Sequence, residues 1–260
     1  MLHPTDIIVE NPHQSPVRVA LLGYGKMGKI VGQLAPQQGF EVVWRSPSGE
    51  WNAGEFRFPP GMPPVDVAIE FSSPQGAPGH IRACLERGIP VVVGTTGWYA
   101  HLEEMSHLCR LRGGALLCAT NFSVGVHLFW ELAERVTQVM RGWPGYRISI
   151  EETHHTEKKD APSGTAITLA QRVARQLVTG DGKPGPDGVG QPGPAEPPIV
   201  SHRRDGVVGS HRLVFTSGAD AISLQHDANS RDAFALGALR AARWILGKQG
   251  VFEFGDVLRP

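Results

Sequence analysis

The chain has few cysteines and no excess of charge of either sign. Its 260 residues include three cysteines, Cys84, Cys109 and Cys118, with no Cys-x-x-Cys spacing among them. A disulfide framework or a cysteine zinc site is therefore not expected. Lys plus Arg and Asp plus Glu each number 25, so the chain lacks the positive charge that would attract nucleic acid or an anionic membrane. We expect neither as a partner.

Long apolar runs are also missing from the sequence. None reaches the length of about 18 residues that a membrane span requires. Residues 1–16 do not place a cationic region before an apolar one, as a secretory signal would. We interpret them as a loosely held leader and expect a cytoplasmic protein in a reducing compartment.

Glycine and proline are plentiful, at 32 and 21 residues. Loops and tight turns therefore form much of the chain, while a hydrophobic content of 41% is that of an ordinary globular protein. At about 150 residues per domain, the length predicts one large domain or two modest ones.

The first half of the chain alternates between two patterns. Apolar runs of strand length lie at residues 17–22, 41–44, 65–71, 89–94 and 115–120. Segments that can form helices lie between them, at residues 29–38, 77–87 and 101–112. Strands that alternate with helices at this spacing predict an α/β domain with a Rossmann-like, doubly wound parallel sheet.

The pattern changes after Phe122. Helices are predicted at residues 124–140, 165–178 and 232–246, and strands at 146–152, 207–215 and 221–226. Residues 179–198 are so rich in glycine and proline that we predict a surface loop. We expect a second, α+β domain with a mixed or antiparallel sheet to interrupt the first. Residues 1–124 and 230–260 would form the first domain and residues 125–229 the second.

A glycine-rich turn follows the first predicted strand and precedes the first predicted helix. It reads Gly23-Tyr24-Gly25-Lys26-Met27-Gly28, a G-x-G-x-x-G pattern. The first glycine permits a tight turn, the second lets the backbone approach a pyrophosphate, and the third allows close packing of helix and strand. In this context we predict dinucleotide binding, with the anion at the helix N-terminus. A turn of purely structural function can match the same pattern.

The end of the second strand indicates which dinucleotide is preferred. The residue at this position reaches the adenosine ribose, and a carboxylate there would accept a hydrogen bond from the 2′-hydroxyl. This chain instead has Trp44-Arg45-Ser46, with no carboxylate before Glu50. Arginine and serine suit a 2′-phosphate, so we predict NADPH as the preferred cofactor over NADH. The alternative is a solvated Arg45 and use of both cofactors.

Small polar residues follow three further predicted strands. Ligands of open α/β sheets lie outside the carboxyl ends of the strands, where such residues gather. Each turn alone could be structural, but together they outline a nicotinamide pocket. The residues concerned are Ser72, Gly94, Thr95, Thr96, Asn121 and Phe122.

Residues 151–166 are the stretch richest in reactive side chains. They follow an alternating strand and lead into a helix. The helix start can offer hydroxyls and unpaired N–H groups to a carboxylate, from Ser163, Gly164 and Thr165. Proton donors and positive charge lie just upstream, at His154, His155 and Lys158. A small dianionic molecule would be held well here, with a proton available.

Two other interpretations apply to this segment. The paired histidines beside Glu151 and Glu152 could ligate a metal. Side chains of adjacent residues rarely point at one centre, so we expect no metal. A plain surface loop with an N-cap at Ser163 is the simplest alternative, but the density of histidine, lysine and an anion-ready helix start argues against it.

These motifs resemble those of the 4-hydroxy-tetrahydrodipicolinate reductase (dihydrodipicolinate reductase) family of lysine and diaminopimelate biosynthesis. The specific motif is H-H-T-E-K-K-D-A-P-S-G-T-A. Four others occur in the family's order and cover most of the chain: G-Y-G-K-M-G, V-V-V-G-T-T-G, A-T-N-F-S-V-G-V and R-D-G-V-V-G-S-H.

The resemblance implies an enzyme that reduces 4-hydroxy-tetrahydrodipicolinate to tetrahydrodipicolinate with NAD(P)H. It implies that His154 is the acid–base residue and Lys158 the other proton donor, while His155 and residues 163–165 bind the substrate carboxylates. Cofactor contacts are implied for Gly23, Tyr24, Gly25, Lys26, Met27, Gly28, Gly94, Thr95, Thr96, Ala119, Thr120, Asn121 and Phe122. A homotetramer joined through the sheet of the second domain is also implied.

Two features depart from the family's pattern, and two rival functions stay open. Many members have an additional glycine in the first loop, and an acidic residue where this chain has Arg45. A reductase of the aspartate-semialdehyde type would need a nucleophilic cysteine, whereas Cys118 lies in an apolar strand where an inert thiol is expected. A nonenzymatic nucleotide-sensing module would keep the fold without His154 or Lys158, and both are present.

Overall fold

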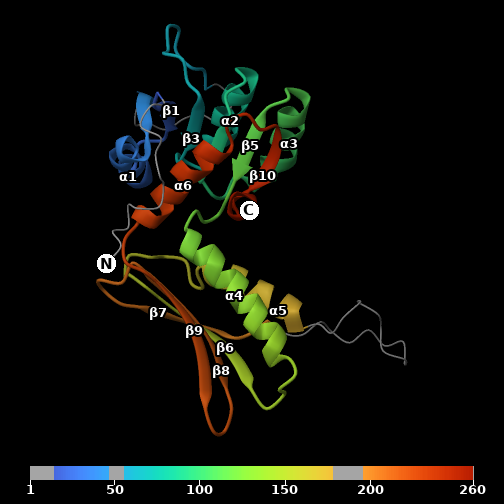
Figure 1. Cartoon of the computed structure of the whole chain (residues 1–260). Coiled ribbons are helices and arrows are strands. Elements are labelled where there is room, and N and C mark those ends of the chain that lie inside the picture. The colour runs from blue at the N-terminus through green and yellow to red at the C-terminus, as the bar shows by residue number, and fades with distance from the viewer. Residues whose placement is uncertain (1–14, 47–55, 178–195, 260) are drawn as a thin grey trace. The chain divides into compact units, whose positions relative to one another are not determined.

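The structure, a computed structural model, describes residues 15–46, 56–177 and 196–259 (Figure 1). The chain divides into two compact units, Met1–Ser123 with Arg231–Pro260, and Val124–Ser230. The second unit is therefore an insertion in the chain of the first. No described helix is long and apolar enough to cross a lipid bilayer.

A six-stranded sheet forms the centre of the first unit. Its strand order is β10-β5-β4-β3-β1-β2, and every pair of neighbours is parallel. Every residue of β3 and β4 is buried, as in parallel strands that are covered on both faces. The strands are β1 (Val17–Leu22), β2 (Phe40–Arg45), β3 (Val67–Glu70), β4 (Val91–Val93), β5 (Ala115–Cys118) and β10 (Gly250–Glu253). The predicted doubly wound parallel sheet is confirmed.

Helices flank this sheet in two pairs. The helix α1 contacts α6, and α2 contacts α3. The helices of this unit are α1 (Lys26–Leu34), α2 (Ala77–Glu86), α3 (Leu102–Leu111), α6 (Asp232–Trp244) and the short α7 (Phe254–Leu258), with 3-10 turns at Pro36–Gln38 and Tyr99–His101.

The first helix begins earlier than predicted. It starts at Lys26 rather than at Lys29, because the last three residues of the glycine motif form its first turn. Lysine and methionine favour a helix, and Gly28 allows that turn to pack against the loop. The helix ends at Leu34, ahead of Pro36, because proline has no N–H to donate to the next helical hydrogen bond.

The second unit holds a four-stranded sheet with strand order β7-β6-β8-β9. The strand β6 pairs with β7 in parallel and with β8 antiparallel, so the sheet is mixed. Two helices, α4 (Val124–Met140) and α5 (Gly164–Leu177), lie along one face of it (Figure 1). The strands are β6 (Arg147–His154), β7 (Ile199–Arg203), β8 (Gly209–Thr216) and β9 (Ala221–Ala228). The core between helices and sheet contains Trp130, Ile150, Leu169, Val173, Leu213 and Phe215.

Two strands were not predicted from the sequence, β7 and β10. Both lie at the edge of their sheet. Most of the predicted loop at residues 179–198 lies outside the described residues, and β7 begins directly after it, at Ile199.

Candidate active site

The carboxyl edge of the six-stranded sheet gathers the residues predicted to bind the cofactor. The strand β1 ends at Leu22, β3 at Glu70, β4 at Val93 and β5 at Cys118. Each is followed directly by one of the predicted binding segments. Since the strands are parallel, these segments lie at one edge, where open α/β sheets bind their ligands.

Each glycine of the first loop meets a different constraint. Gly23 has φ +92, and a Cβ there would lie 2.2 Å from the Phe71 carbonyl oxygen. A Cβ on Gly28 would lie 2.1 Å from the carbonyl oxygen of Gly23. Gly25, the N-cap of α1, has open space around its missing Cβ. The loop therefore needs Gly23 and Gly28 for its own packing, whereas the space beside Gly25 is free for a ligand.

Arg45 and Ser46 lie beside this loop. The Arg45 guanidinium is 5.1 Å from the centre of the Tyr24 ring, a cation–π contact. The buried Ser46 hydroxyl accepts a hydrogen bond of 2.7 Å from the Gly23 N–H. Sequence reasoning assigned Arg45 to the ribose end of the site but missed the support that Ser46 gives the loop. Lys26 and Met27 form the first turn of α1.

Polar groups at the ends of β3 and β4 bind one another. The Ser72 N–H donates to Thr95 Oγ1 at 2.8 Å and to Glu70 Oε1 at 3.0 Å, and the Ser72 hydroxyl also bonds to Glu70. A Cβ on Gly94 would lie 2.0 Å from the Phe71 ring. These residues therefore fix the shape of the edge, and Thr96 beside them is exposed.

The segment after β5 is held in the same way. Asn121 Oδ1 accepts a hydrogen bond of 2.8 Å from the Ser123 N–H. The buried ring of Phe122 lies edge-on to Phe71 and Phe254, at 5.9 Å and 5.2 Å between ring centres. Asn121 and Phe122 thus act first as structural residues of this edge. The segment is accessible at Ala119, which is half-buried, and Thr120, which is exposed.

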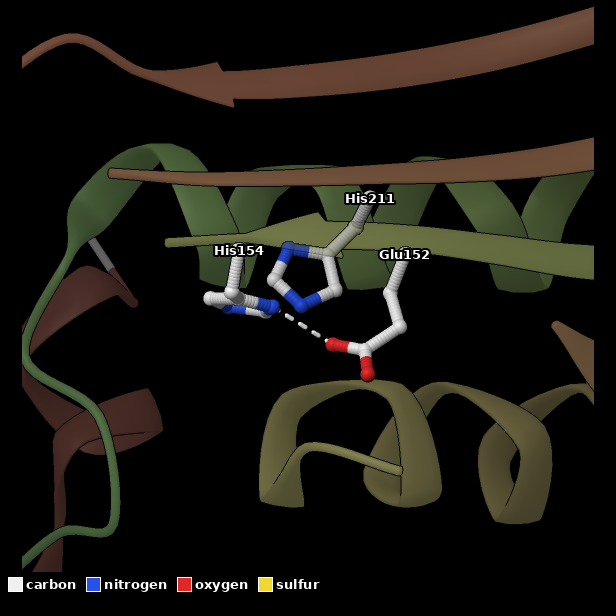
Figure 2. A group of neighbouring side chains, drawn as sticks. All are labelled: Glu152, His154 and His211. Carbon is white, nitrogen blue, oxygen red and sulfur yellow. Dashed lines mark ion pairs between the residues drawn. The ribbon is translucent and has the colours of Figure 1, made fainter. Parts of the chain in front are cut away.

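A second cluster lies in the other unit, at the end of β6. Side chains of alternate residues in a strand share a face, and Ile150, Glu152 and His154 are the buried ones here. Figure 2 shows Glu152 and His154 from β6 beside His211 from β8. The Nδ1 atom of His154 is 2.6 Å from Glu152 Oε2, and the His154 and His211 rings lie edge-on, 5.1 Å apart.

Hydrogen bonds keep the buried Glu152 ionised. Its Oε1 atom accepts from the Ser163 N–H at 3.3 Å and from Arg203 Nη1 at 3.2 Å. Burial alone would raise the pKa of Glu152, but hydrogen bonds from Ser201, Ser163 and Arg203 and the nearby His154 hold that pKa below its usual value. The cluster therefore contains a fixed negative charge.

The two histidines of the cluster are neutral near neutral pH. Burial lowers the pKa of His154, and the cations of Lys158 and Arg203 lower it further, against the opposing effect of Glu152. Burial lowers the pKa of His211 to about 4. The Nε2 atom of His211 is 3.1 Å from Ser163 Oγ, so the cluster reaches the start of α5.

The predicted substrate residues surround this cluster. Ser163 is buried, and its hydroxyl accepts a hydrogen bond of 3.2 Å from the Ala166 N–H, so it caps α5. Gly164 is exposed, and Thr165 and His155 are half-buried. Lys158 Nζ is 2.8 Å from each carboxylate oxygen of Asp160. Ser163 therefore organises the helix start, while its neighbours are accessible to a ligand.

Sequence reasoning missed Glu152, Arg203 and His211 as members of this site. Strand pairing brings them together: His154 lies opposite Arg203 of β7, and Glu152 lies opposite His211 of β8. The alternation of β6 was a usable signal, because it places Glu152 on the buried face together with Ile150. Nothing in the spacing of the sequence indicated the other two.

The cluster also has the composition of a metal site. One ligand atom from each of Glu152, His154 and His211 lies within 4.8 Å of the others. The cations of Arg203 and Lys158 face the same group, and their charge opposes a bound metal cation.

Family profiles match both units of the chain. The profile described as "Dihydrodipicolinate reductase, N-terminus" matches residues 60–122, and "Dihydrodipicolinate reductase, C-terminus" matches residues 125–258.

Curated relatives carry the same name. A "4-hydroxy-tetrahydrodipicolinate reductase" of Christiangramia forsetii is 37% identical, over 93% of this chain and 98% of its own. Proteins of that name from Stenotrophomonas maltophilia and Xanthomonas campestris are 37% and 39% identical, over 95% and 94% of this chain and 100% and 98% of their own.

Solved structures share the fold. A dipicolinate-bound dihydrodipicolinate reductase from Paenisporosarcina sp. TG-14 aligns with a TM-score of 0.70 at 23% identity, over 92% of this chain and 97% of its own. An amine dehydrogenase from Mycobacterium smegmatis aligns with a TM-score of 0.55 at 12% identity, over 95% and 97%. The profiles and the nearly full-length relatives confirm the resemblance seen in the sequence: the chain belongs to the dihydrodipicolinate reductase family.

Proposed function

We propose that this chain reduces 4-hydroxy-tetrahydrodipicolinate to tetrahydrodipicolinate with a reduced nicotinamide dinucleotide. Membership of the family supports this reaction, and the glycine loop supports cofactor binding by the first unit. The second unit binds the substrate. The observation that carries the proposal is the cluster at the end of β6, where a buried His154 lies with Glu152 at one nitrogen, near the start of α5.

The residues of the second unit donate a proton and stabilise negative charge. The bound cofactor supplies hydride to C4 of the unsaturated cyclic imine that forms when the substrate loses water. The resulting enamine must be protonated on carbon, and His154 donates this proton while the ammonium of Lys158 stabilises the developing negative charge. The carboxylates of the substrate favour protonation of His154, because a nearby opposite charge raises the pKa of a histidine.

The start of α5 binds the carboxylates of the substrate. The first turn of this helix contains no acidic residue of its own, and the Glu152 carboxylate accepts from the N–H of Ser163, the residue before the first turn. The N–H groups of the first turn can therefore still face an anion. The space around Gly164 is open, and the backbone N–H groups there are accessible to an anion. Thr165, His155 and Lys158 supply the remaining donors.

NADPH is the preferred cofactor and NADH the weaker one. Arg45 supports this assignment, because its guanidinium is exposed and stacked on Tyr24 beside the glycine loop. A guanidinium in this place suits a 2′-phosphate.

The working protein is a cytoplasmic homotetramer joined through the sheet of the second unit. The helices α4 and α5 cover one face of this sheet. Val200, 47% exposed, places an apolar side chain on the other face, as an interface would use. A reducing compartment suits the three cysteines, which are all free.

A cysteine-dependent reductase fits the structure poorly. Burial raises the pKa of Cys118 to about 12, so almost no thiolate forms near neutral pH. A nonenzymatic nucleotide-sensing module would have no use for the buried Glu152 and His154 pair, and removal of that pair is the natural test.

Two substitutions test the proposed roles. His154→Ala removes the proton donor, so we expect kcat to fall by about 100-fold or more with little change in KM. Thr165→Ala removes a carboxylate contact, so KM for the substrate is expected to rise about tenfold with kcat nearly unchanged. Steady-state oxidation of NADPH with freshly generated substrate measures both. The opposite pattern, with KM changed by His154→Ala and kcat by Thr165→Ala, contradicts the assignment.

A further inference from the structure

We infer that Glu152 is a positioning residue for His154: it holds the ring with Nδ1–H toward its carboxylate, so that Nε2 is the nitrogen that transfers the proton. This inference rests on the proposed function, because it assigns the orientation of the residue that the reaction uses. It adds a residue that lies outside the motif and that the alternation of β6 places on the buried face.

The first observation is the contact itself. Glu152 and His154 lie two positions apart in β6, so their side chains share the buried face. Glu152 Oε2 is 2.6 Å from His154 Nδ1 (Figure 2), and Glu152 is 1% exposed. An ionised carboxylate can only accept hydrogen bonds, so the nitrogen that faces it must carry a hydrogen in both the neutral and the cationic ring.

Glu152 is itself fixed from the opposite side. Its Oε1 atom receives hydrogen bonds from Arg203 Nη1 and from the Ser163 N–H. Arg203 also donates to the carbonyl oxygens of Lys158, at 3.3 Å, and Asp160, at 2.6 Å. The carboxylate therefore connects the ring of His154 to the backbone of the Lys158 segment and to the start of α5, which sets the relative positions of the proposed donors.

The other side of the ring lies against a glycine. A Cβ on Gly209 would lie 3.1 Å from His154 Nε2, so the absence of a side chain there leaves room at this nitrogen. The edge of the His211 ring lies against His154 and limits its rotation. One nitrogen thus lies 2.6 Å from a carboxylate and the other faces a residue without a side chain, an arrangement like that of sites where a carboxylate orients a histidine.

The charges around His154 set the sign of the expected effect. Glu152 is the group that favours the imidazolium, while Lys158 of the following loop and Arg203 of β7 disfavour it. His211 of β8 and the neighbouring His226 of β9 have lowered pKa values and are neutral near neutral pH. The remaining charge is that of Asp160, which Lys158 pairs. Removing the charge of Glu152 therefore lowers the pKa of His154.

A pH profile of kcat tests this inference in the whole enzyme. An enzyme that needs a protonated donor loses activity as the pH rises through the pKa of that donor. We therefore expect the pH at which kcat falls to be about one to two units lower in Glu152→Gln than in the parent. Glu152→Asp, which restores the charge, should recover most of the shift. Glu151→Gln is the matched control, because Glu151 lies on the opposite face and pairs with Arg212; its profile should coincide with that of the parent.

Nitrogen NMR of the unsubstituted protein provides a second test that does not depend on a variant of Glu152. With ring-labelled histidine, and the His154 signals assigned from His154→Gln, neutral His154 should be the Nδ1–H tautomer. The inference is overturned if neutral His154 is the Nε2–H tautomer, or if kcat of Glu152→Gln falls at the same pH as kcat of the parent. The proposed function fails differently: the parent then turns over no substrate, or His154→Ala leaves kcat unchanged.

Discussion

Arg45 carries the residue-level prediction on cofactor choice. We expect Arg45→Ala to lower kcat/KM for NADPH by about 10- to 100-fold, the value of a hydrogen bond to a charged group. The value for NADH, which has no 2′-phosphate, should change by less than about threefold. Steady-state kinetics with both cofactors measures the ratio.

Arg18→Ala is the matched control for loss of a cation from the same unit. Arg18 pairs with Asp66 through its Nη2 atom at 2.6 Å, and it begins β1 rather than ending it. The ratio of NADPH to NADH efficiency should be that of the parent in this control. An unchanged ratio in Arg45→Ala itself would show that the guanidinium does not contact the phosphate.

The grouping of site residues was predictable where the residues stand close together in one motif. His154, Lys158 and Ser163 stand within one short segment, so their grouping followed from the sequence. Glu152 was noted only as a neighbour of the paired histidines, because its function depends on which face of β6 is buried. Arg203 and His211 come from strands that the register of the sheet places beside β6, and a one-residue slip in register would turn them away.

The glycine loop gives a prediction at the level of an element. Gly28→Ala places a Cβ 2.1 Å from the Gly23 carbonyl oxygen, so the free energy of unfolding should fall by about 1–3 kcal/mol, as expected for overpacking. Gly25→Ala meets no protein atom within 4 Å, so its cost should stay below about 1 kcal/mol, the cost of alanine at an N-cap. Chemical denaturation measures both.

Cofactor affinity provides a second measurement on the glycine loop, at Gly25. If the pyrophosphate binds at this loop as proposed, a methyl group at Gly25 would occupy the space it needs, so Gly25→Ala should weaken NADPH binding by about tenfold or more. Calorimetric titration of the folded variant gives the dissociation constant. Parental affinity in Gly25→Ala would mean that the loop is a structural turn, the alternative that its sequence pattern leaves open.

Strands and helices were predictable where the sequence has a continuous apolar run or a single apolar face. The strand β7 was missed because its sequence, I-V-S-H-R, has neither pattern. Ser201 and Arg203 lie opposite Glu152 and His154 and bind the buried carboxylate. The inner face of this strand is therefore polar at the two positions that lie beside Glu152 and His154. The strand β10 has only four residues at the edge of its sheet, too few to establish a period.

At the scale of the whole molecule, the chain forms two units with separate cores. The unit with the parallel sheet carries the glycine loop and Arg45. The inserted unit carries the cluster of Glu152, His154 and His211. The change of pattern after Phe122 predicted two types of sheet, because each sheet type leaves its own pattern in the sequence.

Transfer of deuterium tests the central claim, that this chain reduces a cyclic imine with hydride from a nicotinamide. Purified protein would be incubated with freshly generated 4-hydroxy-tetrahydrodipicolinate and NADPH deuterated at the transferring position of its nicotinamide. The account predicts substrate-dependent oxidation of the cofactor, with deuterium recovered at C4 of the product ring by mass spectrometry and NMR. Folded protein that oxidises no cofactor, or oxidises it without deuterium reaching C4, would contradict the account.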